Sequence, residues 1–226
     1  MSRTAAPRRP FIYVLAGVNG AGKSSVGGAH IEDNGLTWFN PDTYARMLVT
    51  EQGRTLEQAN ADAWQSGRKR LEAAIAENKS FAFETTLGAS TIPRLLQEAS
   101  RTHDVLMWFF GLSSPEQHIA RVAARVAKGG HPIPEKKIRE RWDGSRLNVI
   151  QLLPHLAHLQ VYDNSADVRP GQPIPDPVLV LEMTQGRIIS PDPHDAEALA
   201  HTPAWAKQIV QAAIELDATT GLVGDP

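Results

Sequence analysis

The fold is decided by eight residues near the start of the chain, Gly17-Val18-Asn19-Gly20-Ala21-Gly22-Lys23-Ser24. They match the pattern Gly-x-x-x-x-Gly-Lys-Ser, in which glycines let backbone N–H groups curl around phosphates and a following helix presents its positive end to them. In this pattern Lys23 reaches the β- and γ-phosphates, and the hydroxyl of Ser24 ligates Mg²⁺. We therefore expect a site for ATP, with GTP as an alternative, formed by Gly17, Asn19, Gly20, Ala21, Gly22, Lys23, Ser24 and Ser25.

The segments on either side of this loop supply the context that the pattern needs. Residues 11–16 form a short run rich in β-branched and aromatic side chains, which predicts a buried strand. Residues 23 to about 31 can form a helix. A loop between a strand and a helix favours a phosphate-binding loop, or P-loop, over a glycine-rich turn without nucleotide.

The rest of the chain alternates predicted strands with predicted helices. Further strands are expected at 36–39, 80–83, 104–110 and 158–162, with a small hairpin at 178–183 and 186–189. Helices are expected at 41–51, 56–77, 92–100, 114–128, 133–152 and 203–216. This alternation predicts an α/β fold: a P-loop kinase-like three-layer sandwich, with a five-stranded, mostly parallel sheet and helices on both faces. We expect a flexible tail at 1–10, a kinase core at 11–165 with a lid at about 114–150, and a C-terminal extension at 166–226 packed on the core.

Composition narrows the classes of function. The chain has 226 residues, which fits one domain, and its formal net charge of -2 gives no support to a nucleic-acid partner. It has no cysteine, so disulfides, thiolate catalysis and cysteine-based metal sites are excluded. No apolar run approaches the roughly 18 residues of a membrane-spanning helix. The apolar stretch after Arg8-Arg9 is too short for a secretory signal, so we expect no membrane partner and a cytoplasmic protein.

Acidic residues follow two of the predicted strands. Asp42 comes after the strand at 36–39, and Glu84 after the strand at 80–83. Ligands of α/β sheets bind at the carboxyl ends of the strands, so both acids are expected in one cleft with Lys23. Taken alone, Asp42 could be a helix-start acid and Glu84 a plain loop acid. No acid ends the strand at 104–110, which favours a small-molecule kinase over a motor ATPase unless Glu84 takes the role of the second, Walker-B acid.

Transfer of a phosphoryl group needs positive charge beside the γ-phosphate. Arg121 and Arg125 are four residues apart and share one face of the helix predicted at 114–128. Arg139 and Arg141 lie on the next predicted helix. These arginines indicate a mobile lid over the phosphates, and the competing interpretation is a solvated basic face.

Seven segments of the chain, in the same order, resemble the zeta-toxin family and in particular its bacterial chromosomal branch. They are residues 17–25, 39–42, 83–87, 114–116, 121–126, 129–134 and 161–165. The resemblance implies an ATP- and Mg²⁺-dependent kinase that phosphorylates the 3′-hydroxyl of the sugar in UDP-N-acetylglucosamine. It also implies the toxin of a toxin–antitoxin system, with a cognate antitoxin as partner. Residues from 166 onward carry no recognisable motif of this family.

The resemblance assigns roles to individual residues. The family's catalytic aspartate matches Asp42, and its substrate-binding acid and threonine match Glu84 and Thr86. Its first lid arginine falls on Arg121 or Arg125. The position of its second lid arginine falls near His131, with Arg139 as the nearest arginine downstream, and its acid on the long helix is replaced near Arg68.

These observations combine into one mechanism with two alternatives. Lys23 and the loop hold ATP, Asp42 accepts the proton of a substrate hydroxyl, and Arg121 and Arg125 neutralise charge during transfer. One alternative keeps the reaction but changes the acceptor to a nucleoside, NAD or an antibiotic hydroxyl. The other is a nucleotide-dependent switch or ATPase.

Overall fold

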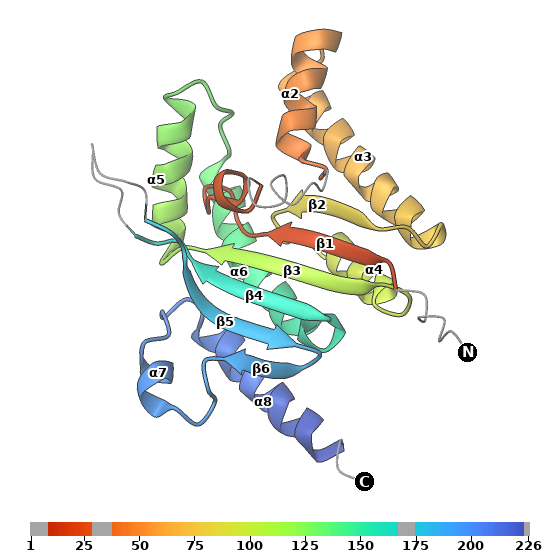
Figure 1. Cartoon of the computed structure of the whole chain (residues 1–226). Coiled ribbons are helices and arrows are strands. Elements are labelled where there is room, and N and C mark those ends of the chain that lie inside the picture. Colours follow the sequence, from red (N-terminus) through yellow and green to blue (C-terminus); the bar gives the residue numbers. More distant parts are fainter. Residues whose placement is uncertain (1–8, 29–37, 167–174, 224–226) are drawn as a thin grey trace.

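The computed structural model describes residues 9–28, 38–166 and 175–223, which build one six-stranded sheet flanked by helices (Figure 1). The strands are β1 (Phe11–Ala16), β2 (Phe81–Thr85), β3 (Asp104–Gly111), β4 (His158–Asp163), β5 (Val178–Thr184) and β6 (Arg187–Ser190). They are ordered β2-β1-β3-β4-β5-β6. The first four strands in this order run parallel, β5 runs antiparallel to β4, and β6 runs antiparallel to β5. The carboxyl ends of β2, β1 and β3 therefore meet at one edge of the sheet, where the P-loop lies.

The predicted α/β fold is confirmed, but the strand inventory differs from the expected five. The expected hairpin joins the sheet as β5 and β6 because β5 pairs with the open edge of β4 and buries Leu181 and Met183 in the core. Within the strand expected at 36–39, Phe39 makes an isolated bridge to Phe83 of β2. Positions 36 and 37 of that expected strand lie outside the described residues.

The helices occupy most of the expected positions. They are α2 (Pro41–Gln52), α3 (Leu56–Ala76), α4 (Thr91–Ala99), α5 (Pro115–Val126), α6 (Glu135–Leu152), α7 (Ala196–Ala200) and α8 (Lys207–Val223), with the short turns η1 (Ser24–Gly28) and η2 (Leu153–His155). The helix predicted at 23–31 is described only as the five-residue π-helical turn η1, and positions 29–31 lie outside the described residues. Within the described ranges, no helix is both long and apolar enough to cross a membrane.

The last helix was predicted to begin at residue 203, which is wrong: α8 begins at Lys207. Residues 203–206 instead form a turn that places Trp205 and Ala206 in the core. Trp205 packs on Phe109 of β3, at a ring-centroid distance of 6.2 Å. Burial of this large indole against the sheet explains why the chain turns here before α8 starts.

One large core joins the sheet to four helices, α3, α4, α6 and α8. Strand residues that alternate along β1, β3 and β4 fill it from one side: Ile12, Val14, Met107, Phe109, Leu159 and Val161. Helix residues fill it from the other: Leu95, Leu96, Val149, Leu152, Ile209 and Val210. The helices α2 and α3 pack on each other and rise beyond β2, at the top of Figure 1. They form a wall beside the carboxyl edge of the sheet.

Candidate active site at the carboxyl ends of the strands

The P-loop connects β1 to η1, and three of its glycines, Gly17, Gly20 and Gly22, have positive φ angles. Gly20 and Gly22 have φ angles of 84° and 88°, in the region that residues with a Cβ rarely adopt. A Cβ on Gly22 would also collide with the amide of Asn164. Within the loop the N–H of Ala21 donates to the carbonyl of Val18 at 3.1 Å, which closes the turn.

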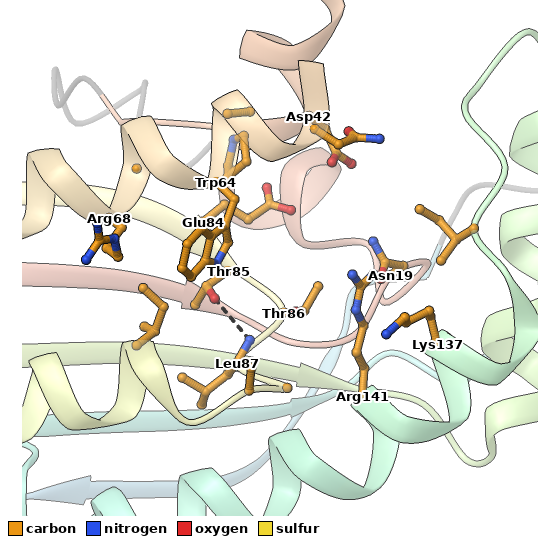
Figure 2. Close-up of a pocket in the computed structure, with 18 of the residues that line it drawn as sticks. Asn19, Asp42, Trp64, Arg68, Glu84, Thr85, Thr86, Leu87, Lys137 and Arg141 are labelled. Atoms are coloured by element: carbon orange, nitrogen blue, oxygen red, sulfur yellow. Dashed lines mark hydrogen bonds between the residues drawn. The ribbon is translucent and has the colours of Figure 1, made fainter. Parts of the chain in front are cut away.

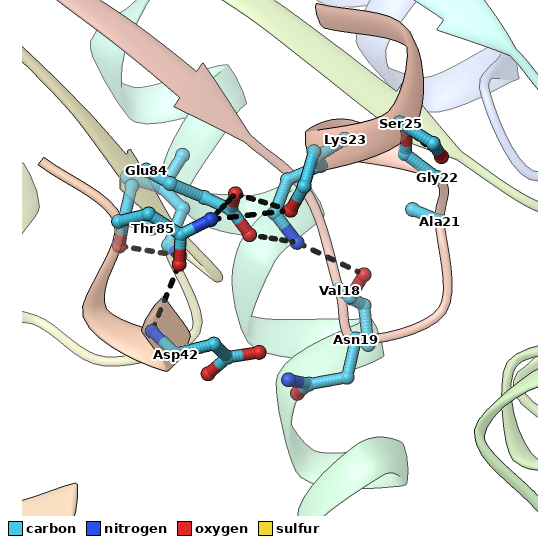
Figure 3. Close-up of polar contacts among 12 residues, drawn as sticks. Val18, Asn19, Ala21, Gly22, Lys23, Ser25, Asp42, Glu84 and Thr85 are labelled. Carbon is cyan, nitrogen blue, oxygen red and sulfur yellow. Dashed lines mark hydrogen bonds and ion pairs between the residues drawn. The ribbon is translucent and has the colours of Figure 1, made fainter. Parts of the chain in front are cut away.

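Lys23 and Ser24 both contact Glu84 (Figure 3). The Nζ of Lys23 lies 3.3 Å from Oε1 of Glu84, and the Ser24 hydroxyl donates to Oε2 at 2.7 Å. The register between β1 and β2 explains why Glu84 reaches these two residues. Glu84 pairs with Leu15 of β1, which lies two residues before the loop begins. Glu84 therefore lies among the phosphate-binding residues, which favours the alternative in which it takes the Walker-B role.

The same residues fit a Mg²⁺ ion. The hydroxyl of Ser24 and the carboxylate of Glu84 are hard oxygen ligands of the kind that Mg²⁺ prefers. The amide of Asn40 donates to Oε2 of Glu84 at 3.3 Å and orients that carboxylate. In the part of the chain that the structure describes, no group of three or more histidine, cysteine, aspartate or glutamate side chains could hold a metal alone. An ion here would thus need phosphate oxygens and waters to complete its coordination.

Asp42 stands in the first turn of α2. Asn40 caps this helix by accepting hydrogen bonds from the N–H groups of Asp42 and Thr43, at 2.9 and 3.1 Å, and Pro41 occupies the first helical position. The cap belongs to Asn40, so the carboxylate of Asp42 is left to face the cavity that it lines. It is 49% exposed, and its Oδ2 lies 3.6 Å from Nη1 of Arg125.

The four candidate arginines make different contacts in the structure. Arg121 donates to the carbonyl of Ala166, and Arg125 donates to the carbonyl of His131 while pairing with Asp42. Arg139 is exposed and forms an ion pair with Glu116 at 2.6 Å, which directs it away from the site. The structure thus does not bring Arg139, the nearest arginine after His131, to the cavity.

Arg141 is the arginine of α6 that lines the cavity; the sequence placed it among the lid arginines, but the role in transfer was assigned to Arg121 and Arg125. Its Nη1 donates to Oδ1 of Asn19 in the P-loop at 2.6 Å. Burial lowers the pKa of Arg141 from its ordinary value, and the nearby charge of Asp42 opposes that shift. The helical periodicity of α6 is the sequence signal that could have distinguished Arg141. Ile138, Ser145 and Val149 are buried on one face of the helix, and Arg141 lies on that face while Arg139 does not.

A cavity of about 550 Å³ extends from the P-loop to α3. Figure 2 shows Asp42, Asn19 and Arg141 at one end and Trp64 and Arg68 at the other. The middle is lined by the segment after β2, which includes Thr86. Glu84, Thr86 and Asp42 therefore share this cavity, whereas Arg121 and Arg125 do not line it.

The far end of the cavity combines an aromatic ring with a cation. Trp64 is 44% exposed, and the guanidinium carbon of Arg68 lies 5.8 Å from the centre of its ring. Arg68 is held in place by Glu72 at 3.0 Å and Gln65 at 3.2 Å. A flat, partly exposed indole beside a fixed guanidinium can bind a planar or anionic part of a ligand.

Comparison with known sequences identifies the region that holds the site. Residues 12–144 match the family described as AAA domain, and they contain the P-loop, Asp42, Glu84 and Arg141. An uncharacterized protein of Haemophilus influenzae (strain ATCC 51907 / DSM 11121 / KW20 / Rd) is 30% identical over 135 residues, covering 56% of this chain and 88% of that protein.

Comparison with solved structures shows the fold. The crystal structure of AvrRxo1-ORF1:-ORF2 with ATP matches with a TM-score of 0.63 at 17% identity, covering 88% of this chain. This chain corresponds to only 65% of the length of the matched AvrRxo1 chain. A structure of the PezAT chromosomal toxin–antitoxin system of Streptococcus pneumoniae matches with a TM-score of 0.54 at 13% identity, covering 98% of this chain and 90% of that chain. At these identities the likeness establishes a shared P-loop kinase-like fold.

Proposed function

This chain belongs to the AAA domain family, and on that premise we propose that it is an ATP- and Mg²⁺-dependent kinase that phosphorylates a hydroxyl of a small molecule. The observation that carries the proposal is the cavity of about 550 Å³, which joins the P-loop and is lined by Asp42, Glu84 and Arg141. A kinase needs space for a second substrate directly beside the γ-phosphate, and a switch or simple ATPase does not.

In the proposed site the P-loop and Lys23 bind the phosphates of ATP. Ser24 and Glu84 would hold Mg²⁺, which supplies charge neutralisation on the phosphates when it is bound. When nucleotide enters, its phosphates replace Glu84 as the partner of Lys23. The buried carboxylate then remains with Ser24, which suits it to the metal side of the site.

In the transfer step one proton moves, one bond to phosphorus forms and one bond to phosphorus breaks. The acceptor oxygen forms a bond to the γ-phosphorus, the bond from that phosphorus to the β-bridging oxygen breaks, and ADP leaves. Asp42 accepts the proton of the acceptor hydroxyl as the new bond forms. Arg141 neutralises charge on the transferring group from one side, and Arg125, within the proposed lid of residues 114–150, joins it. Arg121 supports this lid through its contact with Ala166.

For the acceptor we propose the sugar of UDP-N-acetylglucosamine. The resemblance to zeta toxins supports this choice, and Glu84 and Thr86 both line the cavity as that resemblance requires. At the far end, Trp64 can stack on a planar ring and Arg68 can meet a phosphate, which suits an acceptor that carries a nucleotide. As the toxin of a toxin–antitoxin system, the protein would also bind a cognate antitoxin.

The test is a transfer screen with ATP labelled at the γ-phosphate. The acceptors are UDP-N-acetylglucosamine, other sugar nucleotides, nucleosides, NAD and antibiotics with free hydroxyls, and the control is the Lys23→Ala protein. We expect a labelled UDP-N-acetylglucosamine product that the control does not form. Labelling of a different acceptor would replace the substrate but keep the kinase, whereas free phosphate without any labelled small molecule would contradict the kinase and favour a switch or ATPase.

A further inference from the structure

Two carbonyl groups of the P-loop accept hydrogen bonds from side chains that belong to other parts of the fold. Nδ1 of His118, in α5, lies 2.9 Å from the carbonyl oxygen of Asn19. The amide of Asn164, just after β4, donates to the carbonyl oxygen of Ala21 at 2.8 Å. Both side chains are buried, with His118 only 1% exposed. Neither residue lines the cavity, so the proposed transfer step leaves them without a role.

These contacts fix the direction of the backbone donors that a phosphate would meet. A trans peptide unit is planar, and its C=O and N–H groups point to opposite sides. A carbonyl held on the outer side of the loop therefore turns the N–H of the next residue toward the inner side. Asn19 is followed by Gly20, and Ala21 by Gly22, so the two contacts orient two N–H groups within the phosphate-binding loop.

We propose that His118 and Asn164 are positioning residues that aim two backbone N–H groups of the P-loop at the nucleotide phosphates. The inference rests on the nucleotide binding in the proposed function, and it is independent of which acceptor is used. Pre-orientation of donors raises affinity because the loop need not be ordered when the phosphates arrive.

The chemistry of His118 fits a single fixed donor. Burial is the main cause that lowers the pKa of His118 to about 4; the charges of Lys23 and Arg121 act in the same direction and the hydrogen bond to Asn19 opposes them, so the ring is neutral at pH 7. A neutral imidazole has one N–H, and the carbonyl of Asn19 requires it at Nδ1. The other ring nitrogen, Nε2, is buried without a hydrogen-bond partner among the described residues. A buried unpaired nitrogen costs stability, so simple packing does not account for a histidine here.

The loop also fits closely against the backbone of His118 and the side chain of Asn164. A Cβ on Gly20 would lie 3.0 Å from the carbonyl oxygen of His118, and one on Gly22 would collide with the amide of Asn164. The two contacts are themselves connected, because Gln117 of α5 donates to the carbonyl of Ser165 at 2.7 Å. The start of α5 and the loop after β4 thus form one support on the outer side of the P-loop.

The experiment measures ADP affinity by calorimetry for the full chain and three variants. His118→Asn keeps an amide donor at the place of Nδ1, whereas His118→Gln moves it to the place of Nε2. Asn164→Ala removes the second contact. We expect His118→Gln and Asn164→Ala to weaken ADP binding about fivefold to tenfold, and His118→Asn to stay within about twofold of the original protein, as for loss or retention of one hydrogen bond.

A second ligand and a stability measurement separate positioning from general damage to the fold. Inorganic pyrophosphate has no base or ribose. The affinities of the variants for pyrophosphate should fall in the same order as their affinities for ADP. Equal affinity of His118→Gln and His118→Asn for both ligands would overturn the inference, and so would losses of affinity that simply follow the melting temperatures of the ligand-free proteins. Because these affinities are measured without an acceptor, they decide the role of His118 even where no acceptor is phosphorylated.

Discussion

The ammonium of Lys23 lies 3.3 Å from the carboxylate of Glu84, and the two side chains are only 5% and 10% exposed. This buried ion pair joins the residue that should bind the phosphates to an acid from the neighbouring strand β2. The other carboxylate oxygen accepts the hydroxyl of Ser24. Glu84 therefore contacts both side chains, Lys23 and Ser24, that the P-loop would present to ATP and Mg²⁺.

Glu84→Gln tests this ion pair. Removing the charge leaves Lys23 buried without a counter-ion, so the free energy of unfolding should fall by about 3 kcal/mol, the lower end for a buried pair that loses one partner. Phosphate would neutralise Lys23 again, so ADP should raise the melting temperature of the variant more than that of the original protein. Urea unfolding and thermal melts, with and without ADP, measure both effects.

The matched control for this prediction is the double variant Lys23→Met with Glu84→Gln. With both charges removed, most of the lost stability should return, because the cost comes from the unpaired ammonium. If the stability losses of the two single variants simply add in the double variant, the ion pair between Lys23 and Glu84 does not stabilise the protein.

Arg141→Ala and Arg139→Ala form a second comparison on one helix. Arg141 contacts the P-loop at Asn19, while Arg139 pairs with Glu116 at the surface. An arginine that meets charge in the transition state can contribute about 10³-fold to the rate, so Arg141→Ala should lower kcat on this scale with a small change in KM. Arg139→Ala should leave both constants nearly unchanged. Steady-state kinetics with equal losses in the two variants would contradict the role of Arg141.

The sequence predicted the part of the fold that depends on local patterns. The P-loop motif and the alternation of strands and helices located β1, β2, β3 and β4 and the helices from α2 to α6, because each has its own apolar periodicity or cap. The hairpin of β5 and β6 was recognised, but its pairing with β4 was not, since a local pattern does not say which sheet edge a strand joins. Of the strand predicted at 36–39, Phe39 makes a bridge to Phe83, while positions 36 and 37 lie outside the described residues.

The site was predictable where chemistry follows directly from a motif or a strand end. Lys23 and Ser24 contact Glu84, because the carboxyl ends of the adjacent parallel strands β1 and β2 lie together, and Asp42 shares with Glu84 the lining of the cavity. The arginines were harder, since four of them lie within 21 positions and only their helical phase and tertiary contacts distinguish them. The roles of Asp42, Glu84, Thr86 and the lid arginines in the reaction stay predictions.

Trp64 gives a prediction about the acceptor. It is 44% exposed at the far end of the cavity, so its removal should not damage the core. Stacking of a base on an aromatic side chain is worth about 1–3 kcal/mol, and Trp64→Ala should therefore raise the KM for a nucleotide-bearing acceptor by about tenfold while kcat is nearly kept. Trp64→Phe, which retains a ring, is the matched control. A KM unaffected by Trp64→Ala would remove this residue from acceptor binding.

His118 gives a prediction about acid stability. Its pKa is lowered to about 4 in the folded protein, while an unfolded histidine titrates near 6.5. Between these values the unfolded chain binds more protons, so stability falls as pH decreases from 6.5 toward 4. Between pH 7 and pH 4.5, the original protein should lose about 2 kcal/mol more than His118→Asn, which cannot titrate there. Urea unfolding at the two pH values measures the difference, and equal losses would show that His118 is not the group responsible.

Asp42→Asn tests the proposed general base. Asparagine keeps the size of the side chain, and Asn40 still caps α2, so the variant should fold and bind ATP normally. Loss of a positioned base should slow single-turnover transfer by about 10² to 10⁴-fold. The substitution also weakens the pair with Arg125, so Arg125→Gln is the control, and it should lose less rate than Asp42→Asn if proton transfer dominates. A rate within a few-fold of the original would exclude Asp42 from the chemistry, whereas a large loss of Mg²⁺–ATP affinity would assign it to the metal site.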